Sequence, residues 1–100
     1  MTRSYLLTDS SSAMLFDGSL VDTWDIRMVG SVLSARTRLI TPGRLYTFII
    51  RQQNTSYRFA WPATCLNAPT VNPQPNSVVV QNFVGQAAGL LQATPPGTAF

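Results

Sequence analysis

Residues 44–61 read RLYTFIIRQQNTSYRFAW, two alternating runs separated by a short polar segment. Successive side chains of an extended chain point to opposite faces, so Tyr46, Phe48 and Ile50 share one face of the first run. Asn, Thr and Ser at positions 54–56 tolerate the backbone angles of a tight loop. The pattern predicts a β-hairpin with an aromatic face. In its second strand that face would carry Tyr57, Phe59 and Trp61.

The composition favours β-structure throughout the chain. All seven positively charged side chains are arginine and all four negatively charged ones are aspartate. Lys and Glu, the common surface residues of helices, are absent, whereas Asp, Ser, Thr, Asn, Gly and Pro disfavour helix interiors. One hundred residues fit one domain. Only 11% of residues are charged, against about 25% in a typical domain, which suits a subunit partly covered by neighbours.

Further short strands are expected along the chain. Asp17-Gly18 favours the turn of a second hairpin over residues 13–22, and Pro42-Gly43 is a strong turn signal. Gln86 to Ala88 is the one place where a single helical turn is expected. Seven to nine short strands imply an all-β fold, a single-domain antiparallel β-sandwich or jelly-roll-like barrel with an extended C-terminal arm. The other expected strands cover residues 23–28, 36–40, 78–84 and 90–93.

We expect residues 1–100 to form a single β-domain. Within it, residues 1–40 would supply first-sheet strands or a docking segment, residues 41–93 an aromatic hairpin module, and residues 94–100 an extended tail held straight by Pro95-Pro96. Burial on both faces is expected for the strand over residues 78–84. The expected core consists of Trp24, Ile26, Tyr46, Phe48, Ile50, Phe59, Trp61, Val80 and Phe83.

The missing residue types exclude most catalytic chemistry. Without His there is no ordinary Ser-His-Asp or Cys-His unit, and without Lys there is no Schiff base. Cys65 is single, so it forms no intrachain disulfide or multi-Cys zinc site, and we expect it to be a buried apolar group. Asp22 and Asp25 would point to opposite faces of one strand, so a surface role, or pairing with Arg27 or Arg36, is favoured over acid–base chemistry. We therefore expect no catalytic residues, no metal and no cofactor.

Two features bear on binding. Aromatic residues interleaved with arginines, at a net charge of +3, are compatible with a single-strand nucleic-acid platform. Such a platform needs exposed rings, whereas alternating aromatics on a hairpin usually form a core, so nucleic acid is the least favoured partner. Arg36 and Arg38 share a strand face and could clamp carboxylates of a partner protein, although simple solvation explains them equally well. No segment approaches the 18–20 or so apolar residues of a membrane span, and the N-terminus lacks the apolar core of a signal peptide.

Several segments together resemble a β-module of bacteriophage virion proteins. They are Pro42-Gly43 with the alternating strand over residues 44–50, the Gln and polar turn over 52–56, the strand ending at Trp61-Pro62, and the Val-Val-x-x-Phe strand ending at Phe83. The resemblance covers roughly residues 40–93. The module occurs in tail-fibre and spike segments and in head fibres or decoration proteins. The usual turn glycine is replaced here by Asn-Thr-Ser.

The resemblance implies a non-enzymatic virion structural protein, typically a homotrimer, whose partners are further copies and the major capsid protein or other virion proteins. A capsid decoration or cement protein, stabilising the head by binding between capsid subunits, fits a chain of about one module best. The alternatives are a tail-fibre, tail or neck component and a receptor- or glycan-binding module using Tyr57, Trp61 and the loop over residues 67–77. The expected protein-interface residues are Arg36, Arg38, Pro73, Pro75 and Phe100.

Overall fold

A computed structural model describes residues 5–55, 57–66, 68 and 74–94. Those residues form eight β-strands and one short 3-10 turn, with no α-helix among them, which confirms the all-β prediction. The 3-10 turn lies one residue beyond the predicted position, and its side chains carry no charge. The elements are β1 (Tyr5–Asp9), β2 (Ala13–Asp17), β3 (Thr23–Arg27), β4 (Ser34–Arg38), β5 (Leu45–Arg51), β6 (Cys65–Leu66), β7 (Val78–Gly85), η1 (Ala87–Gly89) and β8 (Leu91–Ala93).

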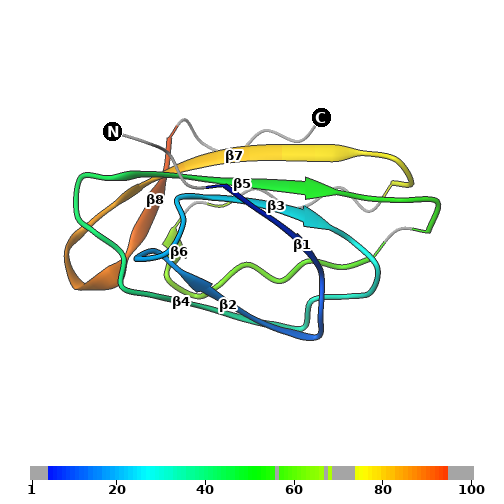
Figure 1. Ribbon diagram of the computed structural model, residues 1–100, viewed down its shortest axis with the longest axis horizontal. Coiled ribbons are helices and arrows are strands. Elements are labelled where there is room, and N and C mark those ends of the chain that lie inside the picture. Colours follow the sequence, from blue (N-terminus) through cyan, green and yellow to red (C-terminus); the bar gives the residue numbers. More distant parts are fainter. Residues whose placement is uncertain (1–4, 56, 67, 69–73, 95–100) are drawn as a thin grey trace.

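The strands form two layers (Figure 1). One layer is a six-stranded sheet in the order β1-β3-β5-β7-β8-β6, and the other is the two-stranded sheet β2-β4. Residues 57–61 lie beside the segment that precedes β4 and run parallel to it, through a bridge between Val32 and Phe59. The two layers face each other across the core, as a β-sandwich requires.

From β1 to β5, successive strands alternate between the two layers, and the chain does not reverse within one layer. It passes from β1 to β2, back to β3, across to β4 and back to β5, so β1, β3 and β5 lie side by side and parallel. β2 and β4 are parallel for the same reason. The predicted antiparallel arrangement is therefore wrong for these strands, because each neighbouring pair is joined through the other layer and not by a hairpin. Among the strand pairs of the described residues, only β5–β7 and β7–β8 are antiparallel.

The hairpin predicted from residues 44–61 does not form. β5 appears as predicted, but its neighbours are β3 and β7, so neither of its edges is open to residues 57–61. The polar segment after β5 is nevertheless a loop, closed by the buried side chain of Gln52. The Gln52 amide donates to the Tyr57 carbonyl at 2.7 Å and accepts from the Tyr57 N–H at 3.0 Å.

The hairpin predicted over residues 13–22 is also wrong. Asp17-Gly18 does form a turn, in which the Asp17 carboxylate accepts hydrogen bonds from the Ser19 N–H at 2.9 Å and hydroxyl at 2.6 Å. This turn leads the chain from β2 across to β3 in the other layer, so no second strand returns along β2. The Pro42-Gly43 turn is confirmed: Arg44 N–H donates to Thr41 O, and Gly43 has a φ of 81°, where glycine is favoured.

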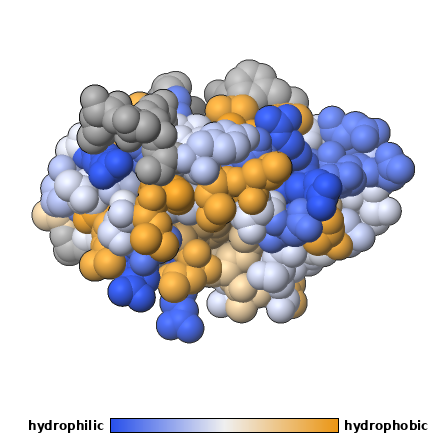
Figure 2. Space-filling view, viewed as in Figure 1, coloured by the Kyte–Doolittle hydropathy of each residue, from blue (hydrophilic) through white to orange (hydrophobic). Residues whose placement is uncertain are grey.

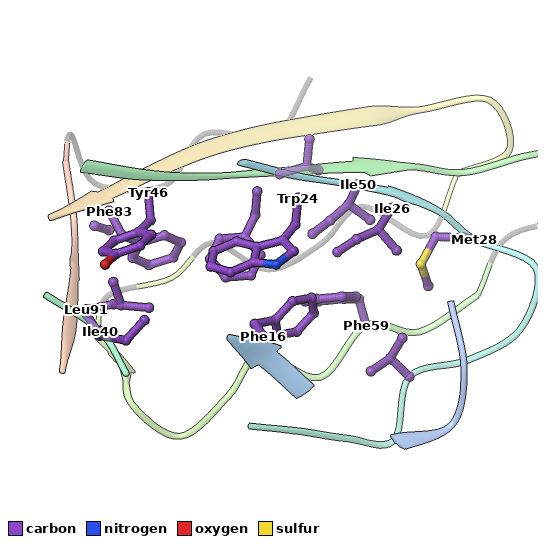
Figure 3. Close-up of a cluster of buried hydrophobic side chains, with 14 residues drawn as sticks. Phe16, Trp24, Ile26, Met28, Ile40, Tyr46, Ile50, Phe59, Phe83 and Leu91 are labelled. Atoms are coloured by element: carbon purple, nitrogen blue, oxygen red, sulfur yellow. The ribbon is translucent and has the colours of Figure 1, made fainter. Parts of the chain in front are cut away.

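The aromatic core lies between the layers (Figure 3). Phe16 of β2 rises from one layer to meet Trp24 and Phe48 of the other, with ring centroids 5.4 and 5.0 Å away. Trp61 is half-buried at the edge of this cluster. The predicted core residues that are fully or nearly buried are Trp24, Ile26, Tyr46, Phe48, Ile50, Phe59 and Phe83.

Val80 is the one predicted core residue that the structure contradicts. It is 41% exposed, whereas Val79 and Phe83 of the same strand are buried. Strand alternation explains this difference, since Val79, Gln81 and Phe83 point to the core and Val80 points to the opposite face. The outer face of β7 is thus partly open, and the expected burial on both faces does not hold for Val80.

Candidate interaction surfaces

The outer face of the six-stranded sheet carries a buried carboxylate held by two partners. Asp25 lies in β3 between β1 and β5, and it is 2% exposed. Arg51 donates from Nε to its Oδ1 at 2.8 Å, and the Tyr5 hydroxyl donates to its Oδ2. Burial alone would raise the pKa of Asp25, but the hydrogen bonds from Arg51 and Tyr5 and the charge of Arg51 outweigh burial and lower it. This group ties three adjacent strands together and offers no free carboxylate for catalysis.

Every aspartate of the chain has an arginine partner among the described residues. Asp9 is held by Arg27 through two hydrogen bonds of 2.8 and 3.0 Å, and this bonding lowers the pKa of Asp9. The predicted pairing of Asp22 or Asp25 with Arg27 or Arg36 is wrong, because parallel strand order brings Arg44 and Arg51 closer. The other ion pairs between described residues are Asp17–Arg38 at 3.4 Å, Asp22–Arg44 at 3.4 Å and Asp25–Arg51 at 2.8 Å.

The ion pair between Asp25 and Arg51 leads to a testable prediction about how stability depends on pH. Its pKa lies below its ordinary value of 3.8 in the folded chain, so the unfolded chain binds more protons at low pH. The stabilisation is present above pH 3.8 and is lost as pH falls through the lower folded pKa. We expect Asp25→Asn to reduce stability at pH 6 and to flatten the decline between pH 4 and pH 2, measured by urea unfolding at each pH. An unchanged slope would show that Asp25 is not held in this way.

Two exposed arginines have no acidic partner within the described ranges. They are Arg36 in β4 and Arg58 in the segment beside it. Arg36 lies opposite Leu15 of β2 in the register, and Leu15 is 56% exposed. A shallow groove of about 550 Å³ runs over this small sheet. Its lining residues are Ala13, Met14, Leu15, Ser34, Arg36, Thr37 and Arg38.

The predicted interface residues are thus only partly brought together. Arg36 and Arg38 do share the outer face of β4, both exposed, although Arg38 also contacts Asp17. Pro75 is exposed in a turn far along the chain from them. Pro73 and Phe100 lie outside the described residues, as does most of the predicted proline loop and the predicted tail.

Exposed apolar side chains are the feature that the sequence patterns did not reveal. Figure 2 shows hydrophobic residues gathered in the middle and lower left of one face of the molecule. Half of the large exposed ones lie between the start of β1 and the start of β3. The only sequence signal for them is the run Tyr5-Leu6-Leu7, which does not alternate and so must leave apolar groups outside. Within the described ranges, the large exposed apolar residues are Tyr5, Leu6, Leu7, Leu15, Leu20, Val29, Leu33, Leu39, Leu45 and Val80.

The rings of the predicted aromatic face, all of which lie in the described part of the chain, form no exposed stacking platform. Tyr46 and Phe48 are fully buried and Phe59 is 8% exposed, so their faces are covered by other side chains. Tyr57 and Trp61 are half-buried and pack against the core. Base stacking would need open ring faces, so the described aromatic cluster is a packing feature.

Cys65 lies half-buried against the core, and burial raises the pKa of its thiol from 9.0 to about 12. A shift from 9 to 12 leaves about a thousandfold less thiolate, the reactive form. We expect a maleimide at pH 7 to label the folded chain far more slowly than the urea-unfolded chain. Equal labelling rates would contradict this placement of Cys65.

Other site types find little support in the described part of the chain. No group of three or more His, Cys, Asp or Glu side chains there could hold a metal ion. Among the same residues, no helix has the length and apolar character needed to cross a membrane. Comparisons with protein-family models, curated proteins and solved structures found no match.

Proposed function

We propose that the chain is a non-enzymatic structural protein of a bacteriophage virion, and within that class a decoration or cement protein that binds between capsid subunits. The virion assignment rests on the sequence resemblance over residues 40–93. One structural observation supports an assembly role: ten large apolar side chains are exposed among the described residues, while all four aspartates are ion-paired. Neighbouring subunits would cover such a surface.

The mechanism would be association alone. Apolar side chains at an interface supply the burial, and arginine anchors supply directional hydrogen bonds to carboxylates or backbone carbonyls. On the small sheet, Leu15 and Arg36 stand side by side and would act in these two ways. Arg36 needs no internal bond to be broken before it binds a partner, whereas Arg38 would have to leave Asp17.

The test is the position of the protein on the particle. Phage particles made without the chain would be incubated with purified protein, pelleted, and imaged by electron cryomicroscopy. We expect added density between capsid subunits and a rise in the temperature at which the heads release DNA. Arg36→Gln should weaken this binding, with Arg27→Gln as a control that removes an arginine already engaged with Asp9. Density on the tail would favour the fibre or neck alternative, and no binding to any particle would refute the proposal.

A further inference from the structure

We infer that the outer edge of β1 is a self-association site, at which the β1 strand of a second copy adds antiparallel and continues the six-stranded sheet. β1 stands at the end of the strand order, and among the described residues its only strand neighbour is β3. An edge strand presents unpaired N–H and C=O groups to any strand that can align with it. The inference rests on this edge alone; the virion proposal enters only in the choice between two and six chains.

The edge lacks the features by which proteins usually prevent such pairing. Exposed edge strands are commonly protected by charged side chains, proline or a bulge. β1 has the sequence YLLTD, and it pairs with β3 in continuous register without a bulge. Its one charge, Asp9, lies at the last position and is held by Arg27 of β3. Residues Tyr5, Leu6 and Leu7 are 57%, 44% and 66% exposed.

The register with β3 shows how both faces of β1 would be used. Tyr5, Leu7 and Asp9 align with alternate β3 residues on the outer face, and Leu6 and Thr8 align with Trp24 and Ile26 on the core side. Leu6 is therefore an apolar side chain at the open end of the core. A second β1 would cover it and would extend the apolar layer beside Trp24.

A second copy fits this edge because β1 is self-complementary. In an antiparallel pair centred on Leu7, that residue meets its own counterpart, Leu6 meets Thr8, and Tyr5 meets Asp9. No like charges face each other, and each Asp9 keeps its own Arg27. A two-fold contact of this kind uses the same patch on both copies. It predicts assemblies of two chains, or of six where three pairs close around the three-fold axis that the sequence resemblance implies.

The test uses charges placed at the centre of the edge, with mass measured by sedimentation equilibrium. We expect wild-type protein to have the mass of two or six chains. Leu7→Lys should halve that mass, because two lysines would stand opposite each other, and Leu7→Glu should do the same. The Asp25 carboxylate, which aligns with Leu7, is already held by Arg51 and Tyr5. A lysine or a glutamate at position 7 can therefore remain in solvent. An equimolar mixture of Leu7→Lys and Leu7→Glu should recover the wild-type mass, since Lys then faces Glu.

Leu20→Lys is the matched control, because Leu20 is 71% exposed but lies in the turn after β2. It should keep the wild-type mass, and circular dichroism should show both Leu7 variants folded. A wild-type mass of one or three chains, a Leu7→Lys mass equal to wild type, or a mixture that fails to reassociate would each overturn the inference.

Discussion

Phe48→Ala is expected to lower the free energy of unfolding by about 3–5 kcal/mol, the usual loss for removing a buried ring. Phe48 is fully buried at the centre of the core. Its ring centroid lies 4.8–5.5 Å from four other rings, so the cavity left by alanine would be lined by large groups that cannot all move inward. Those neighbours are Phe16, Trp24, Trp61 and Phe83.

Urea unfolding followed by tryptophan fluorescence measures this loss. A domain of this size is stable by about 5–15 kcal/mol, so the variant should lose about a fifth or more of its stability. Val80→Ala is the control, because Val80 lies in the strand next to β5 but points outward. It should change stability by about 0.5 kcal/mol or less. Equal losses for the two variants would mean that the rings do not fill the core.

Gly85→Ala is the second substitution with a large expected effect. Gly85 ends β7 against the Pro42-Gly43 turn, where its carbonyl accepts from Gly43 N–H at 2.8 Å and its N–H donates to Arg44 O at 2.8 Å. A Cβ at this position would lie 2.2 Å from the Thr41 carbonyl oxygen, a backbone atom that cannot rotate away. We expect a loss of about 1–3 kcal/mol or more, because the turn or the end of β7 must shift.

Gly30→Ala is the matched control for that change. A Cβ at Gly30 meets no atom within 4 Å, and Gly30 is not among the glycines with positive φ. The alanine should be neutral or stabilising by about 0.4–1 kcal/mol, through reduced freedom of the unfolded chain. Thermal unfolding of the two variants side by side gives the comparison. A Gly85→Ala melting temperature at or above that of Gly30→Ala would contradict the close approach of Thr41 and Gly85.

Alternation along the chain predicted which side chains are buried but not which strands are neighbours. Tyr46, Phe48 and Ile50 face the core as their spacing required, and so do Trp24 and Ile26. Burial depends on local periodicity, which the sequence shows directly. Pairing depends on where each connection leads. A polar turn such as residues 54–56 can close a hairpin or carry the chain to another layer, and its composition is similar in both cases.

The candidate surfaces were harder to predict for the same reason. Arg36 and Arg38 were correctly placed on one exposed face, because that needs only strand alternation. The partners of Asp22 and Asp25 were wrong, since they depend on parallel order of β1, β3 and β5. The exposed β1 edge could not be inferred from the short apolar run Tyr5-Leu6-Leu7, because such a run at a sheet edge has the same composition as one in the centre.

β5 lies between β3 and β7, and its rings are thereby enclosed between two layers. Backbone amide contacts measured by nuclear Overhauser effects test this claim directly. We expect the backbone of residues 47–50 to contact residues 23–26 on one side and residues 79–82 on the other. A continuous ladder of contacts between residues 45–51 and residues 57–61 would instead show an isolated hairpin. It would contradict the alternation of strands between the two layers, the enclosed core and the open β1 edge together.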